Sequence, residues 1–388
     1  MANVYRAPIQ QEFFTMDDKE EDKIPKTRCG YLIPEAYKCY ETALGETGAV
    51  ASGKALHFAA DLVCSGGLDI WIRGAYSYAI EHISLANPRI FVYLKQRISE
   101  LDKKVAILPQ ETFYANHDVQ STLAETVLVM QLCPKRSKIS WPKVDPNTKR
   151  AGWLRGVAGA PETIATRKVW SVNGDTTQLY LVSNELCKSI SEGASERALF
   201  WIRWTLEEDA RIRKETKGHG LSSKERGQAT ASGAKTRSEA GHFLAAVIGE
   251  VYRDLATKNL VRMHEEFGEL MRLWRGGEHR MPARCKRECL ALMCLICCEV
   301  PRWKVPAAPV LVEDPVRLAR AVGQATSFFN EVLAYKSLGI DKQLKPNMTK
   351  AVRKKKEGVV TDQEKREMTM DDKLAAYDLA MEEYLRKL

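Results

Sequence analysis

The chain has 388 residues, 45% hydrophobic content and a formal net charge of +9, values typical of a packed globular protein of two or three domains. Its longest apolar run, 290–300, is shorter than the roughly 20 residues of a membrane span, and the N-terminus lacks a charged region followed by an apolar one, which excludes a transmembrane segment and a secretory signal. We therefore expect a soluble, intracellular protein of a reducing compartment such as the cytoplasm, whose positive charge favours polyanionic partners such as nucleic acid or anionic lipid.

The first 133 residues predict a polar arm followed by a helical block. Residues 1–33 are polar and lack sustained periodicity, so we interpret them as an arm that docks on another surface or stays mobile. Residues 34–133 contain several candidate helices with short links between them, which favour antiparallel neighbours as in helical bundles.

The next region, 134–183, is basic and rich in tryptophan. Between positions 134 and 170, nine Lys and Arg face two acidic residues, so this stretch carries a net charge of +7. Cations neutralise phosphates and flat rings stack on bases, and the combination predicts a nucleic-acid surface. The residues expected to contact nucleic acid are Lys135, Arg136, Lys138, Trp141, Lys149, Arg150, Trp153, Arg155, Arg167 and Lys168. The alternative is that the tryptophans anchor a long loop to the core.

The end of this region carries the clearest β signal of the chain. Residues 169–172 and 176–182 are rich in strand-forming residues, and Asn173-Gly174 lies between them. Asn and Gly readily adopt the positive φ angles of a type I′ turn, so the pattern predicts a β-hairpin.

Residues 184–340 predict a second helical block with a basic insertion. The segment 282–299 is apolar around most of its circumference and is expected to be the most buried helix. Within the block, residues 216–241 contain five glycines, no aromatic residue, and five Lys or Arg against two Glu. Such a composition does not build a core, so we expect a mobile basic insertion.

The tail, 341–388, predicts a basic linker and a C-terminal amphipathic helix. Thr369 and Asp372 form a capping pattern for this helix. Its apolar stripe is made by Leu374, Tyr377, Met381, Tyr384 and Leu388. A short stripe of this kind docks on its own protein or in the groove of a protein partner.

Motifs for catalysis or metal binding are weak. The five cysteines of 285–298 fall on opposite faces of a continuous helix, so they cannot converge on one metal ion and are expected to be buried as small apolar residues. Gly48-x4-Gly53-Lys54 departs from a phosphate-binding loop because Ala55 replaces the magnesium-binding Ser or Thr. The acidic run 207–209 is interpreted as a solvated face. We therefore predict no metal, no cofactor and no catalytic residues.

Two stretches resemble segments of helical proteins encoded by nucleocytoplasmic large DNA viruses. They are CSGGLDIWIRGAYSYAIEHISLANPRIFVYLKQR, residues 64–97, and ALFWIRWTLEEDARIRKE, residues 198–215. The resemblance implies a protein of a viral factory or virion, and it implies a role for no individual residue.

These observations predict a mainly α fold of two helical-bundle blocks with one small β-hairpin and long basic loops. The leading hypothesis is a non-enzymatic nucleic-acid-binding protein that uses its basic loops for phosphate contacts. The alternative is a structural or scaffold protein, for example a minor virion component, that engages protein neighbours through its terminal arms. A third class is an enzyme whose site is assembled from distant residues and is not visible in the sequence.

Overall fold

Helices form every regular element in the part of the chain that the structure describes. This computed structural model describes residues 26–109, 112–149, 152–226, 238–260, 265–275, 283–299, 311–312 and 315–335. Within these ranges the β pairings are two isolated bridges, Lys26 with Leu32 and Asp175 with Ser222. The prediction of a mainly α fold is confirmed. No described helix is both long enough and apolar enough to cross a lipid bilayer.

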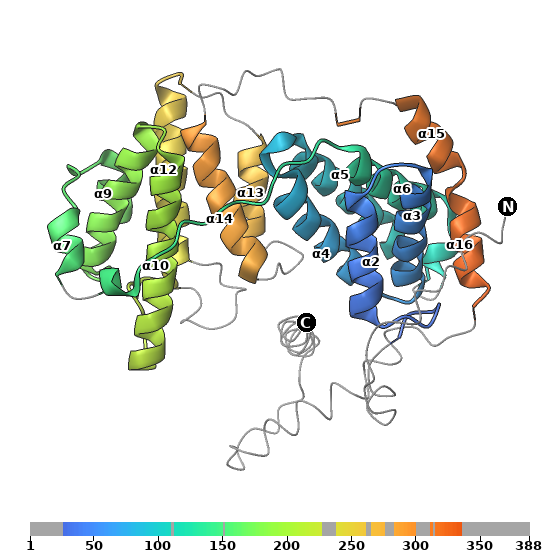
Figure 1. Ribbon diagram of the computed structural model, residues 1–388, viewed down its shortest axis with the longest axis horizontal. Helices are drawn as coiled ribbons and strands as arrows, with labels where there is room; N and C mark the ends of the chain where they lie inside the picture. Colours follow the sequence, from blue (N-terminus) through green and yellow to red (C-terminus); the bar gives the residue numbers. More distant parts are fainter. Residues whose placement is uncertain are drawn as a thin grey trace, which may run out of the picture.

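The helices form two groups, which lie at opposite ends of the molecule (Figure 1). The first group, here called the first lobe, consists of α2 (Ile33–Gly45), α3 (Ala49–Cys64), α4 (Leu68–Tyr78), η1 (Ala79–Ile83), η2 (Ser84–Ala86), α5 (Arg89–Ala106), η3 (Phe113–Ala115), α6 (His117–Leu132), α15 (Pro315–Gly323) and α16 (Ala325–Leu333). Its core is formed by the apolar faces of these helices. In α5, for example, Ile90, Phe91, Leu94 and Ile98 are all buried.

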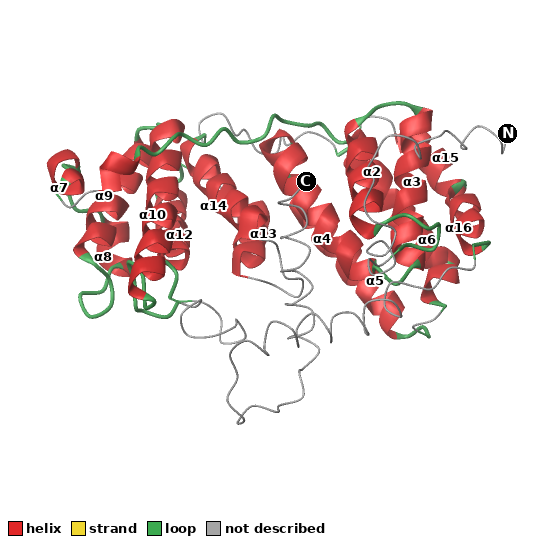
Figure 2. Ribbon diagram, turned by 60° about the horizontal axis from the view of Figure 1, so that its bottom comes forward, coloured by secondary structure: helices red, strands yellow, loops and turns green. Residues whose placement is uncertain are grey.

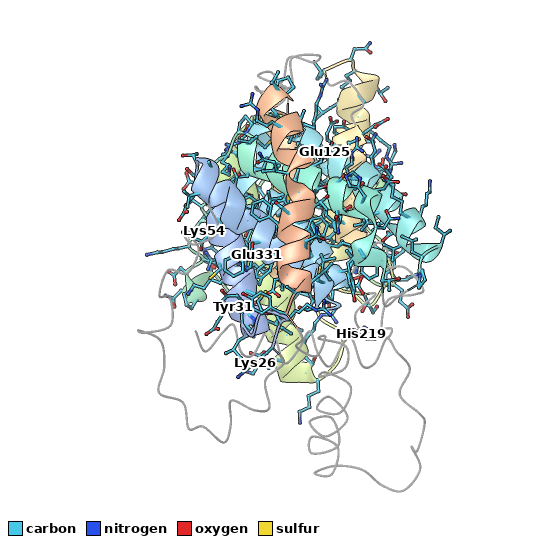
Figure 3. The ribbon with its side chains drawn as sticks, turned by 90° about the vertical axis from the view of Figure 1, so that its right-hand side faces the viewer. Lys26, Tyr31, Lys54, Glu125, His219 and Glu331 are labelled. Carbon is cyan, nitrogen blue, oxygen red and sulfur yellow. The ribbon has the colours of Figure 1, made fainter. Side chains whose placement is uncertain are left out.

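Helices α15 and α16 were predicted to belong to the second helical block, 184–340, but they pack in the first lobe. α15 packs against α6, and α16 packs against α3 and α6 of the first lobe. The buried face of α16 includes Ala325, Phe329 and Val332, each at most 2% exposed, and Figure 3 shows Glu331 of the same helix in front of the first-lobe helices. The spacing of these residues is that of one helix face, but an apolar stripe does not specify the helix that will cover it.

The second lobe is built around the cysteine-rich helix. It contains η4 (Pro146–Lys149), α7 (Trp153–Val157), α8 (Ile164–Val169), α9 (Thr177–Ser191), α10 (Ser195–Thr216), α12 (Ala240–Thr257), α13 (Glu265–Arg275) and α14 (Ala283–Cys298). α14 contacts α9, α10, α12 and α13, and it also contacts η1 of the first lobe. Every residue from Cys289 to Cys298 is at most 6% exposed, which agrees with the expectation that this helix is buried.

The predicted β-hairpin is wrong. Residues 164–169 form α8, and residues 177–191 form α9, with a hydrogen-bonded turn between them in which Ser171 O accepts from Gly174 N and Asp175 N. Leu179, Val182, Leu186 and Ile190 are all buried, and their spacing is helical. The seven-residue window 176–182 was too short to separate this spacing from the alternation of a strand.

Residues 134–149, here called the connector, join the two lobes. Figure 2 shows this segment as a long loop that crosses between the lobes, and in Figure 1 it passes beside α14. It ends in the short helix η4 (Pro146–Lys149). Much of the predicted nucleic-acid surface therefore lies on the segment that links the two halves of the molecule.

Candidate nucleic-acid interface

The cations at the start of the connector are bound to the protein's own acceptors. Lys135 Nζ donates to the carbonyl oxygens of Gln131 at 2.5 Å and Cys133 at 3.4 Å, at the C-terminus of α6. Helices leave their last carbonyls without partners inside the helix, and a lysine ammonium is a favourable donor there. Partial burial also lowers the pKa of Lys135. This lysine caps a helix.

The next two cations pair with glutamates of other elements. Arg136 contacts Glu299, which follows α14, with guanidinium–carboxylate distances of 3.1 and 3.4 Å, while its backbone N–H donates to His82 O at 2.8 Å. Lys138 Nζ lies 3.2 Å from Glu81 Oε2 in η1. Both cations are exposed, but their charge is already offset by a neighbouring carboxylate.

Trp141 anchors the connector to α14. Its Nε1 donates to Glu288 Oε1 at 2.8 Å, and the Arg287 guanidinium lies over the ring, 5.2 Å from the centroid. Arg203 of α10 donates to the carbonyl of Pro142 at 2.9 Å. The indole is partly buried and held on both its edge and its face, so in this conformation it is not a free stacking platform.

Replacing Trp141 with phenylalanine is expected to lower the free energy of unfolding by about 1–3 kcal/mol at neutral pH, because the buried Glu288 carboxylate loses its donor. Burial raises the pKa of Glu288, and the Trp141 hydrogen bond opposes that rise. Because the pKa of Glu288 is raised in the folded protein, ionising this carboxyl lowers the free energy of unfolding. The loss grows as pH rises from the ordinary pKa to the raised one. The deficit of the variant should therefore shrink as pH falls through the raised pKa towards the ordinary value, which urea unfolding at a series of pH values measures.

The remaining predicted residues are placed as follows. Trp153 packs in an aromatic cluster, with ring centroids 6.3 Å from Trp204 and 6.2 Å from Trp201. Arg167 pairs with Glu162 at 2.7 Å, and Arg155 is exposed. The side chain of Lys149, and the whole of Arg150, lie outside the described residues, as do Leu374, Tyr377, Met381, Tyr384 and Leu388.

Lys168 is the predicted residue that lies at a cavity. Its Nζ is 3.4 Å from Glu250 Oε2 of α12. The cavity has a volume of about 300 Å³ and is bounded by α8, α12, α13 and the segment 221–226. Its lining includes four permanent cations, Lys168, Lys224, Arg226 and Arg275, together with the imidazole of His242, and no carboxylate. We call it the cationic cavity.

Two of the four cations of the cationic cavity have no ion-pair partner among the residues that the structure describes. Lys224 and Arg275 are exposed, and neither makes an ion pair with any residue in the described ranges. They come from segments 51 positions apart, and folding places them at one cavity. A cation without a nearby carboxylate keeps its attraction for an external anion, so this pair is the free positive charge of the site.

Arg226 fixes the wall of the cationic cavity. Its guanidinium pairs with Asp175, donates to Ser222 Oγ at 3.0 Å and to Val169 O at 3.1 Å, and lies 5.2 Å from the Phe243 ring centroid. The Asp175 side chain is completely buried and that of Arg226 is 11% exposed. The loop that carries Lys224 is therefore held rigidly on the second lobe.

The basic insertion is partly a packed structure, contrary to expectation. Leu221 and Ser222 near its start, and Ser238 and Ala240 near its end, are at most 1% exposed. Asp209 of α10 holds both ends, because its carboxylate accepts from Leu221 N at 2.7 Å and from Ala240 N at 3.2 Å. Residues 227–237 lie outside the described residues.

The same contacts correct the interpretation of the acidic run 207–209. Glu208 is 1% exposed and Asp209 is 5% exposed, so these two carboxylates are buried. Glu208 is paired with Arg211 at 2.7 Å, and Asp209 is paired with Arg213 at 2.7 Å. The arginines one helical turn later supply the counter-charges that permit burial.

Two other clusters bear on chemistry. Ligand atoms of Glu41, Glu81 and His82 lie within 4.8 Å of one another, but Glu81 is already paired with Lys138 at 3.2 Å and Arg284 at 2.5 Å, so a metal ion would have to displace two cations. All five cysteines of α14 are buried, and burial raises the pKa of the Cys285 thiol to about 12. The Cys285 thiol is therefore protonated and unreactive at neutral pH.

Sequence reasoning missed three of the four cations of the cationic cavity. Lys224 and Arg226 were noticed as part of a basic insertion, whereas Arg275 is one of several cations in a predicted helix. No local signal joins residues 168, 224–226, 242–246 and 271–275, because the cavity exists through the packing of separate elements.

The function of the protein is therefore inferred from the geometry of the cationic cavity. No protein-family model, no curated protein and no solved structure matches this chain.

Proposed function

We propose that this protein is a non-enzymatic nucleic-acid-binding protein that contacts backbone phosphates at the cationic cavity. The observation that carries the proposal is the lining: four Lys and Arg side chains from three separate segments converge there without a lining carboxylate. Lys224 and Arg275 supply charge that no described acid offsets, Lys168 lies beside Glu250, and Arg226, whose N–H groups are bound by Asp175, Ser222 and Val169, anchors the wall. Phosphate oxygens are the acceptors that such a set of donors suits best.

The recognition is expected to depend on phosphate rather than on base stacking by the connector. Trp141 and Trp153 are held in intramolecular contacts, and Trp170 donates to Thr176 O at 3.2 Å while its ring packs on Tyr180. Phosphate contacts carry little sequence information but give a strong salt dependence. The proposed protein therefore binds many sequences with similar affinity.

The test is the affinity of labelled oligonucleotides for the full chain across a salt series, measured by fluorescence anisotropy. The double variant Lys224→Gln/Arg275→Gln should bind about tenfold more weakly or worse. For every phosphate that the variant no longer neutralises, the slope of log affinity against log salt should also fall by roughly 0.7–0.9. Binding by the unaltered chain that is weak and insensitive to salt would contradict the proposal.

A matched control removes the same charge elsewhere. Lys38 and Lys54 are exposed on the first lobe, and Figure 3 shows Lys54 on that side of the molecule. The double variant Lys38→Gln/Lys54→Gln should keep most of the affinity. A second comparison is Arg136→Gln/Lys138→Gln, whose cations are already paired and which should also have a small effect. An equal decrease of affinity in all three variants would indicate a general charge effect and not a site.

A further inference from the structure

We infer that the cationic cavity holds one nucleotide unit, with its phosphate at Lys224 and Arg275 and its base against the apolar part of the lining. The inference rests on the proposed function and specifies what that site recognises. The shared chemistry is a nucleoside 5′-phosphate, which exists as a free mononucleotide and as the phosphorylated 5′ end of a strand.

The size of the cavity is the first argument. Its volume is about 300 Å³, at the lower end of the range of roughly 300–1,000 Å³ for small-molecule sites. A water molecule takes roughly 30 Å³ of liquid volume, and a phosphate group of five heavy atoms takes a few times that. A phosphate alone would leave most of the cavity unfilled, so the site suits a larger ligand that ends in a phosphate.

The lining divides into two chemical parts. Lys224 and Arg275 offer N–H donors, which suit the oxygens of a phosphate. Val169, Ala245, Ala246 and Met271 supply apolar surface, and the two alanines on consecutive positions of α12 keep side-chain bulk small. An apolar surface beside a set of cations favours a ligand with one flat, weakly polar part and one anionic part.

His242 and Trp274 add an aromatic wall to the same lining. Their ring centroids lie 5.6 Å apart with an interplanar angle of 65°, and the indole of Trp274 is 6% exposed. Gly241 permits this position of the indole, because a Cβ there would lie 2.6 Å from Trp274 Cη2. Because Trp274 is nearly buried, it supports the half-buried His242 imidazole, which is the ring of this wall that a planar base contacts.

The experiment measures binding of three probes to the full chain by isothermal titration calorimetry: a nucleoside 5′-monophosphate, the matching nucleoside and inorganic phosphate. The monophosphate should bind about tenfold more tightly than either fragment, since it uses both parts of the lining. Monophosphate binding no tighter than that of inorganic phosphate would overturn the inference.

Variants separate the two parts of the site. Lys224→Gln/Arg275→Gln should weaken the monophosphate and leave the nucleoside unchanged. Ala246→Leu fills the apolar part and should weaken the monophosphate about tenfold, whereas Ala256→Leu, a partly exposed alanine of α12 that does not line the cavity, should not. An equal decrease of affinity with the two leucine variants would also overturn the inference.

Oligonucleotide competition distinguishes the sources and the two proposals. Stronger displacement of the monophosphate by a 5′-phosphorylated strand than by a 5′-hydroxyl strand assigns the site to strand ends, and displacement by neither strand assigns it to free nucleotides. If oligonucleotides bind with steep salt dependence but the monophosphate is no better than phosphate, this inference fails and the proposed function stands. If the monophosphate binds and no oligonucleotide does, the proposed function fails while the nucleotide site stands.

Discussion

Replacing Asp175 with alanine is expected to lower the free energy of unfolding by about 3–5 kcal/mol, the usual cost of removing one partner of a buried ion pair. The carboxylate is completely buried and accepts from Ser171 N at 2.8 Å, Ser222 Oγ at 2.7 Å and Arg226 Nη1 at 2.9 Å. Without it, the guanidinium of Arg226, which is only 11% exposed, has no counter-charge in the described ranges. Chemical denaturation followed by circular dichroism gives the decrease directly.

Asp118→Ala is the matched control, because this aspartate lies on α6 with a side chain that is 78% exposed. It should leave the unfolding free energy nearly unchanged. Asp175→Asn should fall between the two, since the amide oxygen still accepts hydrogen bonds but carries no charge. A decrease below about 1 kcal/mol for Asp175→Ala would show that the buried pair contributes far less than its geometry indicates.

The same substitution links stability to the proposed function. Asp175 fixes Ser222 and Arg226, and Lys224 lies between them on the same segment. At a temperature where the variant is still folded, its affinity for oligonucleotides should drop by an amount comparable to that of Lys224→Gln/Arg275→Gln. Unchanged affinity would mean that the segment reaches the ligand without being held by the buried pair.

The helices could largely be read from the sequence, whereas the site could not. Apolar stripes predict elements such as α14 and α16, because helix burial is a property of residues three and four positions apart. The charge density of a sequence segment predicts a binding partner only if the acids that offset its cations lie within the same segment. Arg136 pairs with Glu299 at a separation of 163 residues, and Lys138 pairs with Glu81 at 57, so these two cations of the connector are offset by acids that no local count includes.

Lys224 and Arg275 also show what the local sequence cannot predict. Lys224 was expected in a loop that builds no core, yet its neighbours Leu221 and Ser222 are buried and anchor it. Other exposed cations such as Lys38 and Lys54 also have no ion pair among the described residues, so what distinguishes Lys224 and Arg275 is that folding brings them to one cavity. That distinction is a property of the tertiary structure, and composition along the chain does not contain it.

Replacing Asp209 with alanine is the second large effect, with an expected decrease of about 3 kcal/mol or more in unfolding free energy, because two buried backbone donors lose their acceptor together. Leu221 N and Ala240 N, on residues that are both fully buried, donate to this carboxylate, and Arg213 Nε lies 2.7 Å from it. Since Leu221 and Ala240 lie near the two ends of the insertion, hydrogen exchange at these two amides should accelerate far more than exchange in α5.

Glu207→Ala provides the comparison, because it removes a carboxylate two positions away on the same helix. Glu207 pairs with Arg203 at 2.6 Å, but the two side chains are 34% and 31% exposed, and exposed pairs of this spacing contribute about 0.3–0.5 kcal/mol. Removing either acid changes the net charge equally, so a large difference between the two variants isolates the hydrogen bonds of Asp209. Equal effects would mean that Asp209 acts through charge on α10, and the two ends of the insertion would then have to be held by their apolar contacts.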